Sequence, residues 1–297
     1  MTGLITTARS LLDDLAQQAE RSTPLGALPD YVPILSQANP QAFGAAVWAV
    51  DGRRWERSQP GRRVVLMSVI KPLLLLYAQA VLGQEAVRSL VDCHPSALPY
   101  NDLNQLLEDG GRPRNAMLNS GAIALAGAIP GQTARDRVRR FQDWLFQTTG
   151  IMVPVNETVL ASVQALPNER NRMIAQTLAQ FGSVTDPVAA LDSYNRLCCS
   201  AIHLPELAQL GGWLADPPAD RVAIVHETLE AMGIAGLYQS TNEWMVRVGW
   251  PAKSGVSGVV WAIQPGRGSI ACYGPLLNPQ GHSITGLAFA ARAIDWF

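Results

Sequence analysis

Apolar residues recur along this chain with helical spacing in some segments and with strand-like spacing in others. Near the N-terminus, Leu4, Leu11, Leu12 and Leu15 fall on one face of an amphipathic helix. The apolar run 44–50, which an Asp-Gly turn follows, predicts a strand that opens a hairpin. A long middle region then has helical patterns separated by clusters of Gly and Pro. We expect these helices over residues 68–82, 84–92, 120–128, 134–149, 158–166, 169–182, 189–200, 205–215 and 219–232.

The pattern turns to strands after about residue 235. We expect strands over 243–249, 258–264 and 269–274, with turns between them, and a last amphipathic helix over 283–297. Strands near both ends of a chain, with helices inserted between them, predict an α+β fold. Its antiparallel sheet would pair early and late segments, and the terminal helices would flank it.

We expect one domain, residues 1–297, made of two lobes. The sheet lobe would comprise about 1–67 and 235–297, and the helical lobe about 68–234. With 48% hydrophobic residues, the chain can bury a large core without a metal ion or a disulfide. The cleft between two such lobes is where we expect a site.

Composition narrows the possible partners and the location. A net charge of −1 argues against nucleic acid, because phosphate binding needs a clustered basic surface. The basic segment 134–141 has helical spacing and predicts a solvated helix face. No apolar run is long enough to span a membrane, and the N-terminus lacks the pattern of a signal peptide. The four cysteines show no Cys-x-x-Cys spacing, so reduced thiols and a cytoplasmic location are expected.

Ser68 and Lys71 lie three positions apart at the start of the expected helix 68–82. Residues at this spacing share a helix face, so the lysine amine could reach the serine hydroxyl. Pro72 is tolerated in the first turn of a helix and places the helix start near Ser68. Burial beside the apolar run that follows would lower the pKa of Lys71 toward that of a usable base. Such a pair also recurs by chance, as two polar residues before a core segment.

A second motif, Lys253-Ser254-Gly255, follows far downstream between two expected strands. A Ser-x-x-Lys pair at a helix start, with a later Lys-Ser/Thr-Gly on an edge strand, is the signature of penicillin-recognising serine enzymes. The third element of such sites comes from the helical lobe. Here Tyr194 could project its phenol into the cleft as a proton shuttle.

Further segments extend the similarity over most of the chain. They are PDYVPILSQANP (29–40), GRPRNAMLNSGAIALAG (111–127), NRMIAQTLAQFG (171–182), LDSYNRLCCS (191–200), GLYQSTNEWMVRVGWPAKSGVSG (236–258) and YGPLLNPQGHSITG (273–286). The first resembles a D-Y-I-P pattern and the last an S-P-P-L-D-x-x-G-N-S-V-x-G pattern, and the others match equally specific patterns in the same order. The chain therefore resembles the serine-dependent glutaminases, a branch of the β-lactamase/transpeptidase-like fold.

The resemblance implies a role for each matching residue. Ser68 would attack the side-chain amide of L-glutamine, form an acyl-enzyme and expel ammonia, and water would then release L-glutamate. Lys71 would accept the serine proton, Tyr194 would relay it to the leaving amine, and Lys253 would complete the catalytic set. The backbone N–H groups of Ser68 and Val256 would form the oxyanion hole.

The resemblance also implies a set of substrate-binding side chains: Tyr31, Asn119, Asn171 and Tyr238. Each has a structural alternative, because the asparagines could cap or cross-link helices and the tyrosines could be half-buried loop aromatics. No metal ion or organic cofactor is implied. The implied partner is a small-molecule amide, and family members commonly form homo-oligomers.

One departure from the family pattern concerns Gln164, seven residues before Asn171. The family has a glutamate there, and its carboxylate receives the substrate's α-ammonium. A neutral amide cannot neutralise an ammonium, and a charge-assisted hydrogen bond is stronger by roughly 1 kcal/mol. The leading hypothesis is an L-glutamine amidohydrolase. The alternative is a serine amidase or acyltransferase of the same fold whose substrate has an acylated amine or none.

Two further hypotheses belong to other classes. A binding protein without catalysis would not need Ser68, Lys71, Tyr194 and Lys253 together, so the intact set argues against it. A penicillin-binding enzyme would share the serine and lysine motifs but not the segments that resemble glutaminases.

Overall fold

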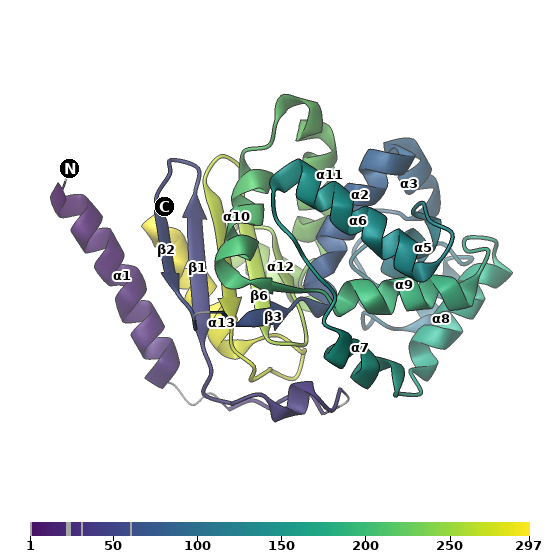
Figure 1. Ribbon diagram of the computed structural model, residues 1–297, viewed down its shortest axis with the longest axis horizontal. Helices are drawn as coiled ribbons and strands as arrows, with labels where there is room; N and C mark the ends of the chain where they lie inside the picture. The colour runs from purple at the N-terminus through teal and green to yellow at the C-terminus, as the bar shows by residue number, and fades with distance from the viewer. Residues whose placement is uncertain (1, 22–24, 31, 60) are drawn as a thin grey trace.

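A computed structural model describes residues 2–21, 25–30, 32–59 and 61–297, with the side chains of the first helix described from Ser10 onward. Five antiparallel strands form the central sheet in the order β2-β1-β7-β6-β5 (Figure 1). The first strand pairs with the last, so that Val47 lies opposite Ile270. The expected α+β fold, with a sheet of early and late segments, is confirmed. The strands are β1 (Gly44–Ala49), β2 (Arg54–Arg57), β5 (Ala252–Ser254), β6 (Val259–Gln264) and β7 (Gly268–Tyr273).

The two terminal helices cover one face of the sheet. Alternate residues of β1, namely Ala45, Val47 and Ala49, belong to the apolar layer that α1 (Thr2–Arg21) and α13 (Ile284–Ala293) complete. Alternation follows from the strand geometry, in which successive side chains point to opposite faces. The terminal helices therefore flank the sheet as expected.

The other face of the sheet is covered by α10 (Leu204–Ala215). Two adjacent glycines of this helix allow the close approach, since a Cβ atom on Gly211 would clash with Ser269 and one on Gly212 with Trp48. The helix lies within the segment 68–234, which was expected to form the helical lobe. One helix of that segment thus packs on the sheet.

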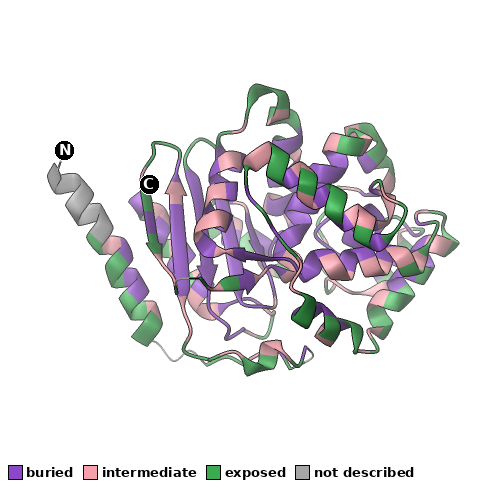
Figure 2. Cartoon of the chain, viewed as in Figure 1, coloured by how far each residue is buried: buried purple, intermediate pink, exposed green. Residues whose placement is uncertain are grey.

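The helix α2 (Lys71–Leu82) is buried over all its residues from Lys71 to Gln79. A helix that is apolar on all sides requires neighbours on all sides, and α5 and α11 are among them (Figure 2). The strand β3 (Arg63–Val65), which precedes this helix in the chain, pairs with β4 (Ala201–His203) in a short two-stranded sheet. Of the helices that follow α2 and precede Gly236, α3, α5, α6 and α11 pack against it. Apart from α10, these helices are α3 (Gln84–Leu90), α4 (Leu103–Glu108), α5 (Asn119–Ala128), α6 (Ala134–Thr149), α7 (Glu157–Gln164), α8 (Glu169–Gln180), α9 (Pro187–Cys198) and α11 (Val222–Ala235).

The expected strand over 243–249 is wrong, because these residues lie mostly in the helix α12 (Thr241–Arg247). Alternating Trp, Val and Val residues suggested a strand. Local hydrogen bonds favour the helix, since the Thr241 hydroxyl donates to the Tyr238 carbonyl and accepts from the Leu237 N–H. Val246 is 83% exposed, as a residue on the outer face of a helix can be.

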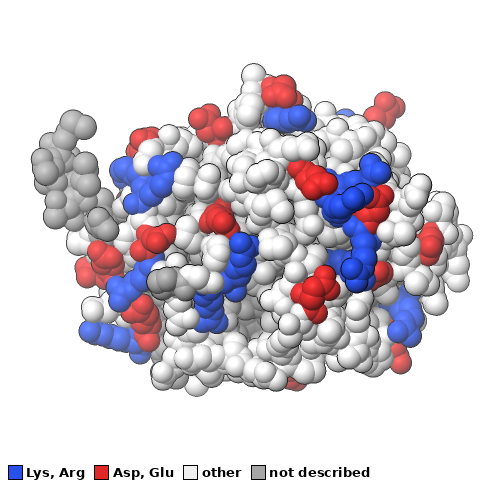
Figure 3. Space-filling view, in the orientation of Figure 1, with Lys and Arg blue, Asp and Glu red and all other residues white. Residues whose placement is uncertain are grey.

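The surface carries mixed charges. On α6 the carboxylate of Asp136 binds both Arg139 and Arg140. Figure 3 shows basic and acidic side chains interspersed over this face of the molecule. The basic segment 134–141 is therefore a solvated helix face, as expected. In the part of the chain that the structure describes, no helix is long and apolar enough to cross a membrane.

Candidate active site

Ser68 lies in the short 3₁₀ helix Met67–Ile70, which leads directly into α2. Met67 has a φ of +47°, in the left-handed region that residues with a side chain rarely adopt. Such backbone strain is often found at functional sites. Pro72 occupies the first turn of α2, where its missing N–H removes no helical hydrogen bond. The backbone thus turns sharply just before Ser68 and presents it at the helix start.

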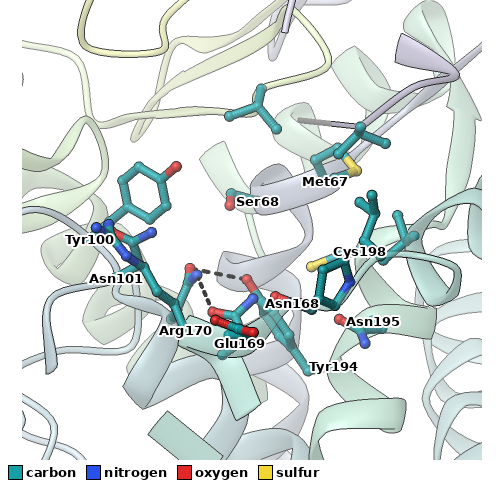
Figure 4. A pocket seen from close by; sticks show the side chains of 17 residues that line it. Met67, Ser68, Tyr100, Asn101, Asn168, Glu169, Arg170, Tyr194, Asn195 and Cys198 are labelled. Atoms are coloured by element: carbon teal, nitrogen blue, oxygen red, sulfur yellow. Dashed lines mark hydrogen bonds between the residues drawn. The ribbon is translucent and has the colours of Figure 1, made fainter. Parts of the chain in front are cut away.

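A cavity of about 640 Å³ opens over Ser68 (Figure 4). This volume lies within the usual range of small-molecule sites. Five of the residues expected at the site line it: Ser68, Asn119, Asn171, Tyr194 and Val256. They come from α5, α8, α9, the start of α2 and the turn after β5, so the fold brings together segments that are far apart in sequence.

Lys71 is fully buried below Ser68. Its Nζ atom donates to the carbonyl of Met117 and to Oδ1 of Asn119, both at 2.8 Å, and lies 3.5 Å from the Tyr238 hydroxyl. Burial lowers the pKa of Lys71 to about 7, because the charged form loses its hydration. A neutral amine has two N–H groups and one lone pair. The two acceptors use both N–H groups, which leaves the lone pair for Tyr238.

Tyr238 contacts both Ser68 and Lys71. Its hydroxyl hydrogen-bonds to Ser68 as well as lying beside Lys71, and burial raises its pKa. Its φ of +53° is a second left-handed value at the site. The Tyr238 ring also lies 4.2 Å from Nζ of Lys253.

Tyr194 lies one step further from the serine. Its hydroxyl donates to Oδ1 of Asn119 at 3.0 Å, and the amide of Asn119 in turn donates to Oδ1 of Asn171 at 2.8 Å. Tyr194 also hydrogen-bonds to the thiol of Cys198. Burial raises the pKa of Tyr194 well above its ordinary value. Tyr194 and Asn171 thus fix the side chain of Asn119, whose Oδ1 accepts the hydrogen bond from Lys71.

Lys253 lies on the edge strand β5, as the motif predicted, and is fully buried. Its Nζ atom donates to the carbonyl of Ser254 at 2.8 Å. Burial lowers its pKa well below the ordinary value, and the nearby Lys71 lowers it further. The following turn carries Val256 to the wall of the cavity. Lys71 and Lys253 are the only lysines in the chain.

Comparison with known proteins decides the family. The sequence model of the glutaminase family matches residues 26–296. The chain belongs to the glutaminase family. A glutaminase from Synechocystis sp. is 41% identical over 269 residues, which cover 89% of this chain and 81% of the relative. The chain is thus an amidohydrolase of this family.

Solved structures of glutaminases share the fold. A probable glutaminase, ybaS, has a TM-score of 0.90 at 30% identity, with 98% of this chain and 96% of that chain covered. The protein Mglu in its L-glutamate binding form has a TM-score of 0.87 at 27% identity, with 97% of this chain and 67% of that chain covered.

The glutamine at the family's glutamate position does not line the cavity. Gln164 is exposed at the end of α7, and its side-chain amide donates to Oδ1 of Asp192 at 3.0 Å. Tyr31, also expected to bind substrate, lies outside the described residues. Within the described residues, no group of three or more His, Cys, Asp and Glu side chains could hold a metal ion.

Several cavity residues were missed from the sequence. Tyr100 stacks on Tyr238 with ring centroids 4.8 Å apart, and Glu169 and Arg170 at the start of α8 line the cavity. The segment before Tyr100 has no helical or strand pattern that could have indicated a site. Glu169 follows an expected loop only two residues before Asn171, so its proximity to a matched position was the available signal.

Proposed function

We propose that this chain hydrolyses the side-chain amide of L-glutamine to L-glutamate and ammonia through an acyl-enzyme on Ser68. The observation that carries the proposal is the hydrogen-bonded line Ser68–Tyr238–Lys71 at the base of a cavity. Its two ends are a serine hydroxyl and a lysine whose pKa is about 7, so a nucleophile and a base are both available near neutral pH.

Acylation follows from this line. Ser68 Oγ attacks the amide carbon while its proton passes to the Tyr238 oxygen, and the Tyr238 proton passes to the lone pair of Lys71. The new C–O bond leaves negative charge on the carbonyl oxygen, which backbone N–H groups of Ser68 and Val256 stabilise. Lys71 then returns its proton to Tyr238, the Tyr238 hydroxyl donates its proton to the amide nitrogen, and the C–N bond breaks to release ammonia.

Deacylation repeats the sequence with water. A water molecule in the place of the ammonia attacks the ester carbon and gives its proton through Tyr238 to Lys71. The C–O bond to Ser68 then breaks, Ser68 Oγ recovers the proton, and the free acid leaves. Tyr238 thus takes the relay role that the family resemblance gave to Tyr194. Tyr194 holds Asn119, which orients Lys71.

A free amino-acid substrate fits the charges of the cavity. Among the described residues that line the cavity, Glu169 carries a carboxyl group and Arg170 a guanidinium group. A carboxylate and a guanidinium at one wall suit the ammonium and carboxylate of an α-amino acid. Mglu, similar in fold, has been solved in an L-glutamate binding form, and L-glutamate is the expected product here.

A second substrate class is favoured by one observation. Gln164 replaces the family's ammonium-binding glutamate and is directed to Asp192. A glutamine derivative whose amine is acylated or absent would not need that carboxylate.

Ammonia release separates these functions. Wild type should release ammonia from L-glutamine, and Ser68→Ala should release none because it lacks the nucleophile. Intact mass after rapid quenching should show the acyl group on wild type alone. Turnover only of N-acylated or deaminated analogues would instead support the second class. A protein that no amide or ester acylates at Ser68 would refute both.

We also propose that the protein is a cytoplasmic homo-oligomer, as the resemblance and the reduced thiols imply. Light scattering on the purified chain and cell fractionation would test these two points.

A further inference from the structure

We propose that His282 is a positioning residue, which holds the Tyr238 phenol between Ser68 and Lys71. The inference rests on the proposed acyl-enzyme mechanism, in which Tyr238 relays the proton. His282 does not line the cavity, and it stands where the family pattern has an asparagine. It therefore acts through Tyr238 and not on the substrate.

The rings of Tyr100 and His282 both stack on the ring of Tyr238. The centroid of Tyr100 lies 4.8 Å away at an interplanar angle of 28°, and the centroid of His282 lies 6.2 Å away at 21°. Tyr238 needs such support because its left-handed φ of +53° is strained for a residue with a side chain. The packing of the ring offsets this strain and keeps the phenol in place.

A hydrogen bond ties the same imidazole to the lysine motif. Nδ1 of His282 lies 2.7 Å from Oγ of Ser254, the residue after Lys253. The backbone N–H of His282 donates to Oδ1 of Asn278 at 2.9 Å, which fixes the loop that carries the ring. His282 is 1% exposed, so these contacts are shielded from water. One ring thus joins Tyr238 to the strand that bears Lys253.

The charge state of the imidazole suits this role. Burial and the adjacent Lys253 lower the pKa of His282 to about 4, and a neutral ring adds no positive charge beside two buried lysines. A leucine of similar volume would lose both the hydrogen bond and the aromatic stack. An asparagine would keep a polar atom near Ser254 and lose the stack alone.

His282→Leu should lower kcat for glutamine about tenfold, which corresponds to about 1.4 kcal/mol, and leave KM within about twofold. Release of Tyr238 would let water reach Lys71, so the midpoint of the acidic limb of kcat should move to a higher pH than in wild type. His282→Asn should recover part of kcat. His203→Asn is the matched control, since His203 is a half-buried histidine that hydrogen-bonds to the Arg62 carbonyl outside the cavity.

A merely structural role predicts a different result. His282→Leu would then lower thermal stability, as His203→Asn does, and leave kcat and the acidic limb unchanged, which overturns the proposal. If His282→Leu does not fold, His282→Asn and Ser254→Ala decide by the same two readouts. Failure of the proposed mechanism is recognised separately, because Ser68→Ala would then retain ammonia release and acylation would be absent in wild type.

Discussion

Glu169 is the carboxylate that the cavity offers to a substrate amine. It is the first residue of α8, and in Figure 4 it lies on the far side of Ser68 from Met67. Among the described residues its carboxylate has no hydrogen bond or ion pair, whereas Arg170 beside it binds Oδ1 of Asn101 at 3.4 Å. An unpaired carboxylate in a binding cavity is available to a cationic group.

Glu169→Gln should raise KM for L-glutamine about tenfold, because a charge-assisted bond becomes a neutral one. Turnover of the analogue with hydrogen in place of the α-ammonium should not change. Steady-state kinetics on both compounds measure the difference. The control is Glu157→Gln. Like Glu169, Glu157 is exposed and is the first residue of a helix that follows an asparagine, but it lines a different cavity. Equal KM changes for both compounds would remove Glu169 from amine recognition.

The sequence could predict that Ser68 and Lys71 lie together, but not that Tyr238 lies beside both of them. Ser68 and Lys71 share one helical turn, so their proximity follows from local geometry. The choice between Tyr194 and Tyr238 depends on a left-handed backbone at Tyr238 and on ring packing across distant segments. The direction of Gln164 toward Asp192 is likewise a contact between two helices.

At the scale of elements, the turn between β5 and β6 presents Val256 to the cavity. Gly258 closes this turn with a φ of +94°, and its N–H donates to the Gly255 carbonyl at 2.9 Å. A Cβ atom at Gly258 would clash with the carbonyl of Gly274 on the neighbouring connection. The turn that carries Val256 therefore depends on a glycine for both backbone angle and space.

Gly258→Ala should lower both stability and kcat, because relief of the clash must shift the turn that carries Val256. The control Gly266→Ala lies in the next hairpin at a φ of +70° with no atom within 4 Å, and should cost only about 1 kcal/mol through strain. Urea unfolding and ammonia release measure the two effects. An equal loss in both variants would show that space at Gly258 is unimportant.

Element type was predictable where apolar spacing was regular. The expected helices between residues 68 and 232 and the strands β1, β6 and β7 follow their patterns closely, whereas the helix α4 (Leu103–Glu108) was not expected. The segment 243–249 was not predictable, because its conformation depends on hydrogen bonds between Thr241 and the preceding turn and on the tertiary packing of Trp244. The pairing of β1 with β7 could be inferred only from the positions of strands at both ends.

At the scale of the whole molecule, the two buried lysines couple stability to pH. Their pKa values are lowered in the native state, whereas in the unfolded chain they stay near 10.5. Above pH 7 the unfolded state then binds more protons than the native state, so stability rises with pH. Buried cysteines with raised pKa values act in the opposite direction above about pH 9.

Between pH 7 and 8.5 the free energy of unfolding should therefore rise, by at most about 1.4 kcal/mol per pH unit for each lysine. Urea titrations at several pH values measure the slope. Lys71→Met should reduce it, because one of the two coupled groups is removed. A flat or falling slope in wild type would mean that both lysines are charged in the native protein.

The burial of both lysines has a practical consequence for labelling. Every other side-chain cation in the chain is an arginine, so a succinimidyl ester finds no lysine on the folded surface. The succinimidyl ester can therefore modify Lys71 or Lys253 only when local opening of this region exposes them to solvent. The rate at which Lys71 and Lys253 gain the label, read by peptide mass, would thus report the opening frequency of this one region in an otherwise native enzyme.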